Sequence, residues 1–349
     1  MEINKPMTTR NMLASTLTDY KKPVKLPKIT VELDPELKVL VAGDASVVEP
    51  FARDHERAEA LVTTEVIAMD EHPASAVRKK KDASIVRAAS AVRAGQADGL
   101  FSAGSTGAVL TAATFGIGRI KGIRRAALAP VVPTGKGGSI LIDAGATAEC
   151  TPEYLLQFAF MGSYYAERIL GRPEPRVGLL NIGAEPSKGM DLQREANSLL
   201  QKAGEQGRIN FTGNVEPREA VYGEVDVIVA DGYSGNIFLK TMEGVGGFLA
   251  RELKAMFKKS MVTKLGALCV KDGLMSFKKL MDSGEVGGTA LLGISKPVIK
   301  AHGSSNDYAI KNAIRQAAAF ASSGIIEDIV ENIDHMRLEK APSSEGAQP

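Results

Sequence analysis

Short apolar runs alternate with helical patterns along the chain from Lys38 onward. The runs lack the alternation of half-exposed strands and stop at Gly, Asp or Asn, which predicts strands buried on both faces. These predicted strands are residues 39–42, 99–101, 140–142, 177–180 and 225–229. Predicted helices between them run from a cap at Asp82 or Ser84 to Gly95, and over residues 152–170 and 190–203. We therefore predict an α/β fold with a mostly parallel, doubly wound sheet.

Residues 247–284 differ from the rest because they combine lysine-rich and apolar helical faces. The apolar face includes Leu253, Met256, Phe257 and Met261, and the basic residues include Lys258 and Lys259. This pattern predicts two amphipathic helices joined near residues 264–272. Such a pair suits an anionic membrane surface, but it also suits dimer packing with a solvated lysine face or docking of an acidic carrier protein. The basic run 78–81 is a second candidate for that docking.

The composition is that of an ordinary globular chain. Its 349 residues carry a formal net charge of +2, and 44% are hydrophobic. Near-neutral charge without interleaved aromatic residues argues against nucleic acid as a partner. The two cysteines, Cys150 and Cys269, cannot form a disulfide framework and fit a reducing cytoplasm. We find no signal-peptide pattern and no bilayer-spanning stretch.

Four predicted strands end in a polar residue and glycine before a helix begins. The loops are residues 102–107, 143–147, 181–189 and 231–236. Ligands of open α/β sheets bind at the carboxyl ends of strands, and glycine permits close backbone approach. The loops together therefore predict an anion-binding cleft at one sheet edge, although each loop alone is more typical of an ordinary turn and helix cap.

Familiar catalytic motifs are missing. The chain has no G-x-G-x-x-G and no complete phosphate-binding P-loop, and Asn236 occupies the last glycine position of a nucleophile elbow. Its four histidines lack metal-ligand spacing. We expect no cofactor, no catalytic metal and no obvious covalent nucleophile. An acyl-Cys150 intermediate is a weaker alternative, because no basic residue lies near Cys150 in sequence.

Several segments form an ordered set along the chain. They are residues 65–70, 76–82, 102–108, 118–122, 178–183, Asp231-Gly232-Tyr233-Ser234-Gly235-Asn236 and Lys300-Ala301-His302-Gly303-Ser304-Ser305. This ordered set resembles the bacterial phosphate acyltransferase family of phospholipid synthesis. The resemblance implies a three-layer α/β/α sandwich with a protruding helical pair, assembled as a homodimer. It also implies acyl transfer from acyl carrier protein to inorganic phosphate. The acyl phosphate product would then serve a membrane glycerol-3-phosphate acyltransferase, placing the protein in the cytoplasm and peripherally on the membrane.

The N-terminal segment departs from the family pattern. Residues 28–31 resemble the family's first strand, but the family's glycine loop and first helix are not found within residues 1–37. Ser105 and Thr147 replace the usual Asn, and Ala184 and Pro186 stand where acidic residues are common. We expect a catalytic domain of residues 38–246 and 285–330, a helical insertion at 247–284, and a C-terminal helix end and disordered tail at 331–349.

For phosphate attack on a thioester, positioning and charge stabilisation matter most. We expect Lys188 to supply charge, Asn181 and Asn236 to donate to the carbonyl oxygen, and His302 to orient phosphate or protonate sulfur. The expected phosphate-binding residues are Ser102, Gly104, Ser105, Thr106 and Ser304. The expected substrate cleft comprises Asp143, Thr147, Glu185, Asp231, Gly232 and Ser234. The alternatives are a structural His302, a solvated Lys188 and loop-capping roles for Asp143 and Asp231.

Two other functions fit the same residues. One is a phosphate acyltransferase that uses acyl-CoA. The other is a catalytically weakened scaffold that binds membrane and partner, which the unusual N-terminal segment suggests.

Overall fold

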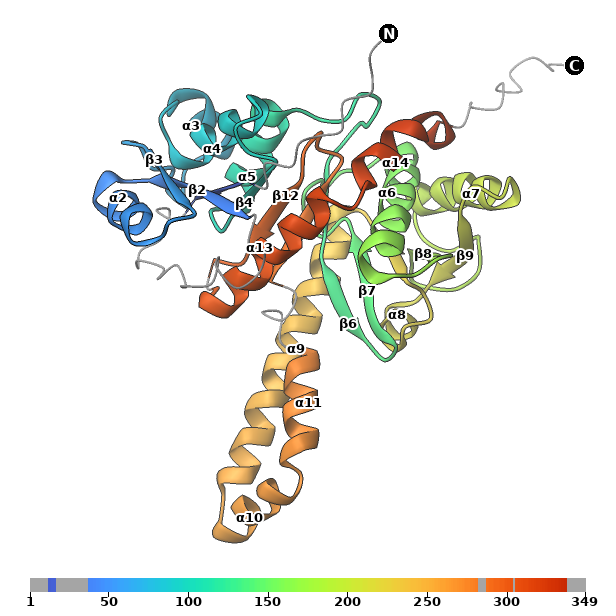
Figure 1. The fold of residues 1–349 in the computed structure, drawn as a ribbon. Coiled ribbons are helices and arrows are strands. Elements are labelled where there is room, and N and C mark those ends of the chain that lie inside the picture. Colours follow the sequence, from blue (N-terminus) through green and yellow to red (C-terminus); the bar gives the residue numbers. More distant parts are fainter. Residues whose placement is uncertain (1–11, 17–36, 282–286, 304, 338–349) are drawn as a thin grey trace, which may run out of the picture.

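The computed structural model describes residues 12–16, 37–281, 287–303 and 305–337 (Figure 1). Their strands form a seven-stranded sheet of order β3-β2-β1-β4-β12-β11-β5 and a five-stranded sheet of order β6-β7-β10-β8-β9. The first sheet comprises β1 Met12–Thr16, β2 Lys38–Gly43, β3 Ala58–Val62, β4 Gly99–Ser102, β5 Ala127–Ala129, β11 Gly288–Leu292 and β12 Val298–Ala301. The second comprises β6 Val131–Thr134, β7 Gly137–Ile142, β8 Arg176–Leu180, β9 Asn210–Val215 and β10 Val227–Val229.

Helices surround both sheets (Figure 1). They are α2 Ala45–Asp54, α3 Pro73–Lys79, α4 Ser84–Arg93, α5 Thr106–Ala112, α6 Pro152–Leu170, α7 Asp191–Glu205, α8 Pro217–Tyr222, α9 Gly232–Lys258, α10 Met261–Cys269, α11 Lys271–Met281, α13 Asp307–Ala321 and α14 Ile325–Glu331. A π-helical turn, Ala113–Ile117, continues α5, and a 3₁₀ turn, Ile333–Met336, follows α14.

Alternate residues of the central strands pack into different hydrophobic clusters, which defines three layers. In β4, Phe101 packs with α13 residues, whereas Leu100 packs with α4 residues. In β7, Ile140 and Ile142 pack with α6, and Leu141 belongs to the cluster on the other face. Successive strand residues point to opposite faces, so each sheet lies between two helical layers. The predicted α/β/α fold class is confirmed.

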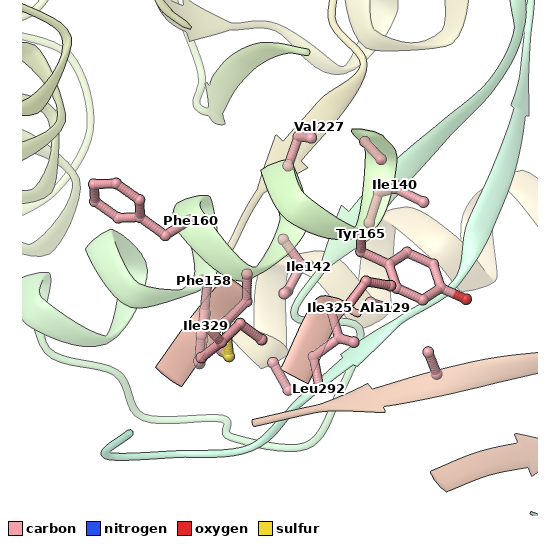
Figure 2. Close-up of a cluster of buried hydrophobic side chains, with 14 of the residues drawn as sticks. Ala129, Ile140, Ile142, Phe158, Phe160, Tyr165, Val227, Leu292, Ile325 and Ile329 are labelled. Carbon is pink, nitrogen blue, oxygen red and sulfur yellow. The ribbon is translucent and has the colours of Figure 1, made fainter. Parts of the chain in front are cut away.

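Helix α6 is the centre of one core cluster. Figure 2 shows its Phe158 and Tyr165 among side chains of β7, β10 and α14. Tyr165 is fully buried, and its hydroxyl accepts a hydrogen bond from Gln316 Nε2 of α13 at 3.0 Å. Because α6 is apolar on most of its surface, it is covered by strands and helices rather than by solvent.

The strands divide between two sheets where the sequence predicted one. Pro130 alone separates β5 from β6, and the chain changes sheets there: Ala129 pairs with Ala290, and Val131 pairs with Ile140. Proline has no N–H for a sheet ladder and so favours such a break. The loop after β4 therefore belongs to a different sheet from the loops after β7, β8 and β10.

One local prediction is corrected by the structure, and the predictions for the two ends of the chain lie outside the described residues. The cap of α4 is Ala83, not Asp82 or Ser84. The Asp82 carboxylate instead accepts hydrogen bonds from Thr64 and Arg87. The predicted first strand, residues 28–31, the region of the missing loop and helix, and the tail beyond residue 337 lie outside the described residues. The strand between β2 and β4 is Met12–Thr16, which the sequence did not predict.

The basic insertion forms a protruding helical hairpin, defined here as residues 247–281 (Figure 1). Its first helix is the outer part of α9, which begins far back at Gly232. The predicted joining segment near residues 264–272 is largely helical, because α10 occupies the tip before α11 returns. Among the described helices, none is both long and apolar enough to cross a membrane.

Candidate active site

A cavity of about 1380 Å³ lies where α9 leaves the two sheets. Its inner wall carries polar residues from separate elements, Thr106 of α5, Asn236 and Lys240 of α9, and Lys300 and His302 of β12 and the following turn. Its outer wall follows the hairpin and combines apolar side chains, among them Leu253, Phe257, Leu274 and Phe277, with the lysines Lys254, Lys258, Lys264 and Lys271. The cavity therefore has a polar inner end, and apolar side chains continue from it along the hairpin.

The loop after β7 is held by a buried carboxylate. Asp143 is fully buried and accepts hydrogen bonds from the backbone N–H groups of Leu128, Ala146 and Thr147 at 2.6–3.0 Å. Burial raises the pKa of this carboxyl to about 6, and the backbone donors oppose that rise. The enclosed oxygens of Asp143 fix the loop, which favours its loop-capping role, and a contact of Asp143 with substrate stays a prediction.

Glycines let α9 begin directly against that loop. A Cβ on Gly235 would lie 2.0 Å from the Asp143 carbonyl oxygen, and one on Gly232 would lie 2.5 Å from the Thr147 carbonyl oxygen. Asp231 caps the helix by accepting from the N–H groups of Tyr233 and Ser234. The capping interpretation of Asp231 is confirmed, and the same packing brings Asn236 beside Gly145 at the cavity.

The predicted phosphate loop after β4 reaches the cavity through Thr106. Ser102 is fully buried, and its Oγ accepts from the N–H of Gly104 at 3.2 Å. Ser105 caps α5 by accepting from the N–H of Ala108. The two serine oxygens thus shape the loop, and Ser304 lies outside the described residues.

The loop after β8 lies beside the site without lining the cavity. The Asn181 side chain donates to the Lys188 carbonyl oxygen at 3.1 Å and accepts from the N–H of Ile182. Lys188 and Glu185 are exposed. Because β8 pairs with β10, this loop neighbours the start of α9, and Gln193 Nε2 contacts Asp231 Oδ2 at 3.5 Å. Three of the four predicted loops therefore share one sheet edge, and the fourth joins them across the cavity.

Sequence reasoning missed Lys300 and Lys240. Burial, and secondarily the charge of Lys240, lower the pKa of Lys300 to about 8. Lys240 is paired with Glu243 at 2.7 Å. The sequence signal for Lys300 was its position, because it opens the matching segment that contains His302 and lies at the end of β12.

Cys150 does not suit the acyl-enzyme alternative. Burial raises the pKa of its thiol to about 12, and its Sγ contacts the Thr147 carbonyl oxygen at 3.3 Å. A thiol with a raised pKa is a poor nucleophile because little thiolate forms near neutral pH.

Comparison with known sequences identifies the chain's family. The profile of the family described as "Fatty acid synthesis protein" matches residues 29–328. The chain is 49% identical over 298 residues to a phosphate acyltransferase of Desulfitobacterium hafniense (strain DSM 10664 / DCB-2), covering 84% of this chain and 88% of that protein. The chain belongs to the phosphate acyltransferase family. It is also 45% identical over 311 residues to the Bacillus pumilus (strain SAFR-032) phosphate acyltransferase, covering 89% of this chain and 91% of that one.

Solved structures agree at the level of fold. EutD phosphotransacetylase from Staphylococcus aureus superposes with a TM-score of 0.58 at 18% identity, covering 89% of this chain and 94% of that one. A phosphotransacetylase from Streptococcus pyogenes gives 0.58 at 19% identity, with 89% and 95% covered. The protein is thus an acyltransferase of a lipid-biosynthetic family, built on the fold of phosphotransacylases.

Proposed function

We propose that the protein transfers a fatty acyl group from acyl carrier protein to inorganic phosphate, forming acyl phosphate for phosphatidic acid synthesis. The observation that carries the proposal is the cavity's combination of a polar end, at Thr106, Asn236 and His302, with an apolar flank along the hairpin. The polar end suits phosphate and a thioester, and the apolar flank suits a hydrocarbon chain. Family membership supports acyl transfer to phosphate.

The reaction needs positioning more than proton transfer. A phosphate oxygen attacks the thioester carbonyl carbon, the C–O bond forms, and the C–S bond then breaks. The electron pair leaves with sulfur as the carrier thiolate, which needs little protonation because a thiol has a pKa of about 8.5. Thr106 and its loop would hold phosphate, Asn236 would donate to the developing oxyanion, and His302 would orient phosphate or protonate sulfur. The predicted roles of Asn181 and Lys188 are not supported by cavity contacts and stay predictions.

The deciding assay is release of the carrier thiol from long-chain acyl carrier protein, with and without phosphate. Phosphate-dependent release with equal formation of acyl phosphate is the expected result. Release without phosphate dependence, or none, would favour the scaffold alternative. Comparing acyl-CoA of equal chain length then decides the donor, and a higher kcat/KM for acyl-CoA would contradict the choice of acyl carrier protein.

The hairpin supports two further proposals. At its tip, Met261, Val262, Leu265 and Leu268 of α10 are 65–80% exposed beside a lysine-rich shaft, which suits peripheral binding to an anionic membrane on the cytoplasmic side. Of the predicted membrane residues, Leu253, Phe257 and Lys258 line the cavity, and Met256, Lys258, Lys259 and Met261 are exposed. Membrane binding would deliver acyl phosphate to a membrane glycerol-3-phosphate acyltransferase.

The shaft of the hairpin presents exposed apolar residues far from the protein body. Phe248, Leu249 and Met256 of α9 and Met275 of α11 are 46–56% exposed. Several exposed apolar side chains on one hairpin are typical of an interface, and a second copy of the chain is the proposed occupant. Sedimentation velocity should give twice the monomer mass, and a monomer at micromolar concentration would contradict the homodimer.

A further inference from the structure

Lys300 lies directly beside the predicted phosphate loop. In the parallel pairing of β12 with β4, Lys300 is in register with Ser102, the first residue of that loop. Matched residues of neighbouring strands present their side chains on the same face of a sheet. On its other side, Lys300 is in register with Thr289 of β11, which also lines the cavity.

Glu243 lines the same cavity as Lys300, but its carboxylate pairs with Lys240 and not with Lys300. The Lys300 Nζ donates to the carbonyl oxygen of Ala301, and no ion pair to a carboxylate is found for it within the described part of the chain. Burial is the main cause of the lowered pKa of Lys300, and the charge of Lys240, a second cation that lines the same cavity, lowers it further. Lys240 reaches the same cavity from α9, although Glu243 partly neutralises it. Placing two ammonium groups around one partly buried cavity is costly unless an anion binds between them.

We propose that Lys300 and Lys240 are the cationic pair that binds the phosphate dianion in this cavity, next to Thr106. Because the reacting phosphate is their ligand, Lys300 would be a catalytic residue. The inference deepens the proposed function, since it rests on inorganic phosphate being the acyl acceptor. It gives to these two lysines the charge-supplying role that the sequence suggested for Lys188.

The chemistry of the pair follows from its position. Two ammonium groups can neutralise a dianion while leaving one phosphate oxygen directed at the thioester carbon. When that oxygen forms the new C–O bond and the C–S bond breaks, charge moves from phosphate to sulfur, and the lysines hold the phosphoryl oxygens throughout. The phosphodiester of a carrier's pantetheine arm offers related chemistry, so the experiment must separate the two anions.

Inorganic phosphate binding to the whole protein, without acyl donor, tests the pair directly by titration calorimetry. Lys300→Met and Lys240→Met should each weaken phosphate binding about tenfold or more, because each removes a charge-assisted contact. Lys254→Met is the matched control: it removes a lysine that lines the same cavity about 21 Å farther along α9, at 1.5 Å per residue. The control should bind phosphate within about twofold of wild type. Because Lys240 is exposed, we expect Lys240→Met to fold, and this variant tests the proposal even where Lys300→Met fails to fold.

Steady-state kinetics distinguish binding of inorganic phosphate from binding of the carrier's phosphodiester. A rise in KM for phosphate of about tenfold, with KM for acyl carrier protein within about twofold, supports the proposal. Unchanged phosphate affinity in both variants overturns it, as does a rise confined to KM for the donor, which would assign the pair to the carrier's phosphodiester. If wild type binds phosphate through the pair but releases no thiol in its presence, the proposed function fails while the assignment of the lysines stands.

Discussion

At the scale of single residues, Asn236 is the predicted residue that the structure places best. It lies at the cavity next to the loop after β7, held there by the glycine contacts at the start of α9. We expect Asn236→Ala to lower kcat about 100-fold, because one oxyanion donor is lost, with KM for phosphate little changed. The rate of carrier-thiol release measures kcat. Lys188→Ala is compared with Asn236→Ala because Lys188 does not line the cavity. A kcat within twofold of wild type for Asn236→Ala would exclude it as the oxyanion donor.

Lys300 makes the phosphate site sensitive to pH. Its pKa is lowered from 10.5 to about 8, so the protonated fraction falls as pH rises through about 8. Between pH 7 and 9 that fraction drops about tenfold, and we expect KM for phosphate to rise about tenfold in the same range. The other titratable side chains of this end of the cavity are Lys240, Glu243 and His302.

The variant Lys300→Arg tests whether Lys300 causes this pH dependence of KM, because the arginine guanidinium stays protonated from pH 7 to 9. Its KM for phosphate should therefore be nearly flat from pH 7 to 9. An equal rise in wild type and Lys300→Arg would assign the pH dependence to another group.

At the scale of elements, α9 connects the catalytic loops to the hairpin, and its first turn tolerates no side chain at Gly235. We expect Gly235→Ala to displace the helix, because its Cβ would lie 2.0 Å from a carbonyl oxygen, costing about 2 kcal/mol of stability and most of the activity. The matched control is Gly244→Ala on the same helix, where a Cβ meets nothing within 4 Å. The control should stabilise the protein by about 0.5–1 kcal/mol. Urea unfolding measures both, and equal stability of the two variants would contradict the close-packing argument.

The same elements show what the sequence could and could not predict. The strands ending at Ile142, Leu180 and Val229 were predictable, because strands buried on both faces leave short apolar runs before glycine. The division into two sheets was not, since it depends on which partners Ala129 and Val131 find on either side of Pro130. Lys300 was missed for a related reason: its importance comes from its register with Ser102, a contact between distant segments.

At the scale of the whole molecule, the hairpin places the proposed membrane-binding tip away from the proposed reaction site. The tip carries exposed Met261 and Leu265, which do not line the cavity, while the proposed reacting end of the cavity lies near the start of α9, at Asn236 and Lys240. Changes at the tip should therefore affect membrane binding without changing catalysis on a carrier-bound donor free in solution. This separation is the basis of the last prediction.

The double variant Met261→Glu/Leu265→Glu should lose flotation with vesicles that contain anionic lipid. Two carboxylates would replace apolar contacts and repel the anionic surface. Its thiol release without vesicles should stay within about twofold of wild type, and its sedimentation should match wild type if the shaft forms the dimer. The control Met261→Leu/Leu265→Met keeps the apolar character and should float normally. Normal flotation of the Glu variant would place the membrane contact elsewhere, and loss of activity without vesicles would show that the tip and the cavity are coupled through α9.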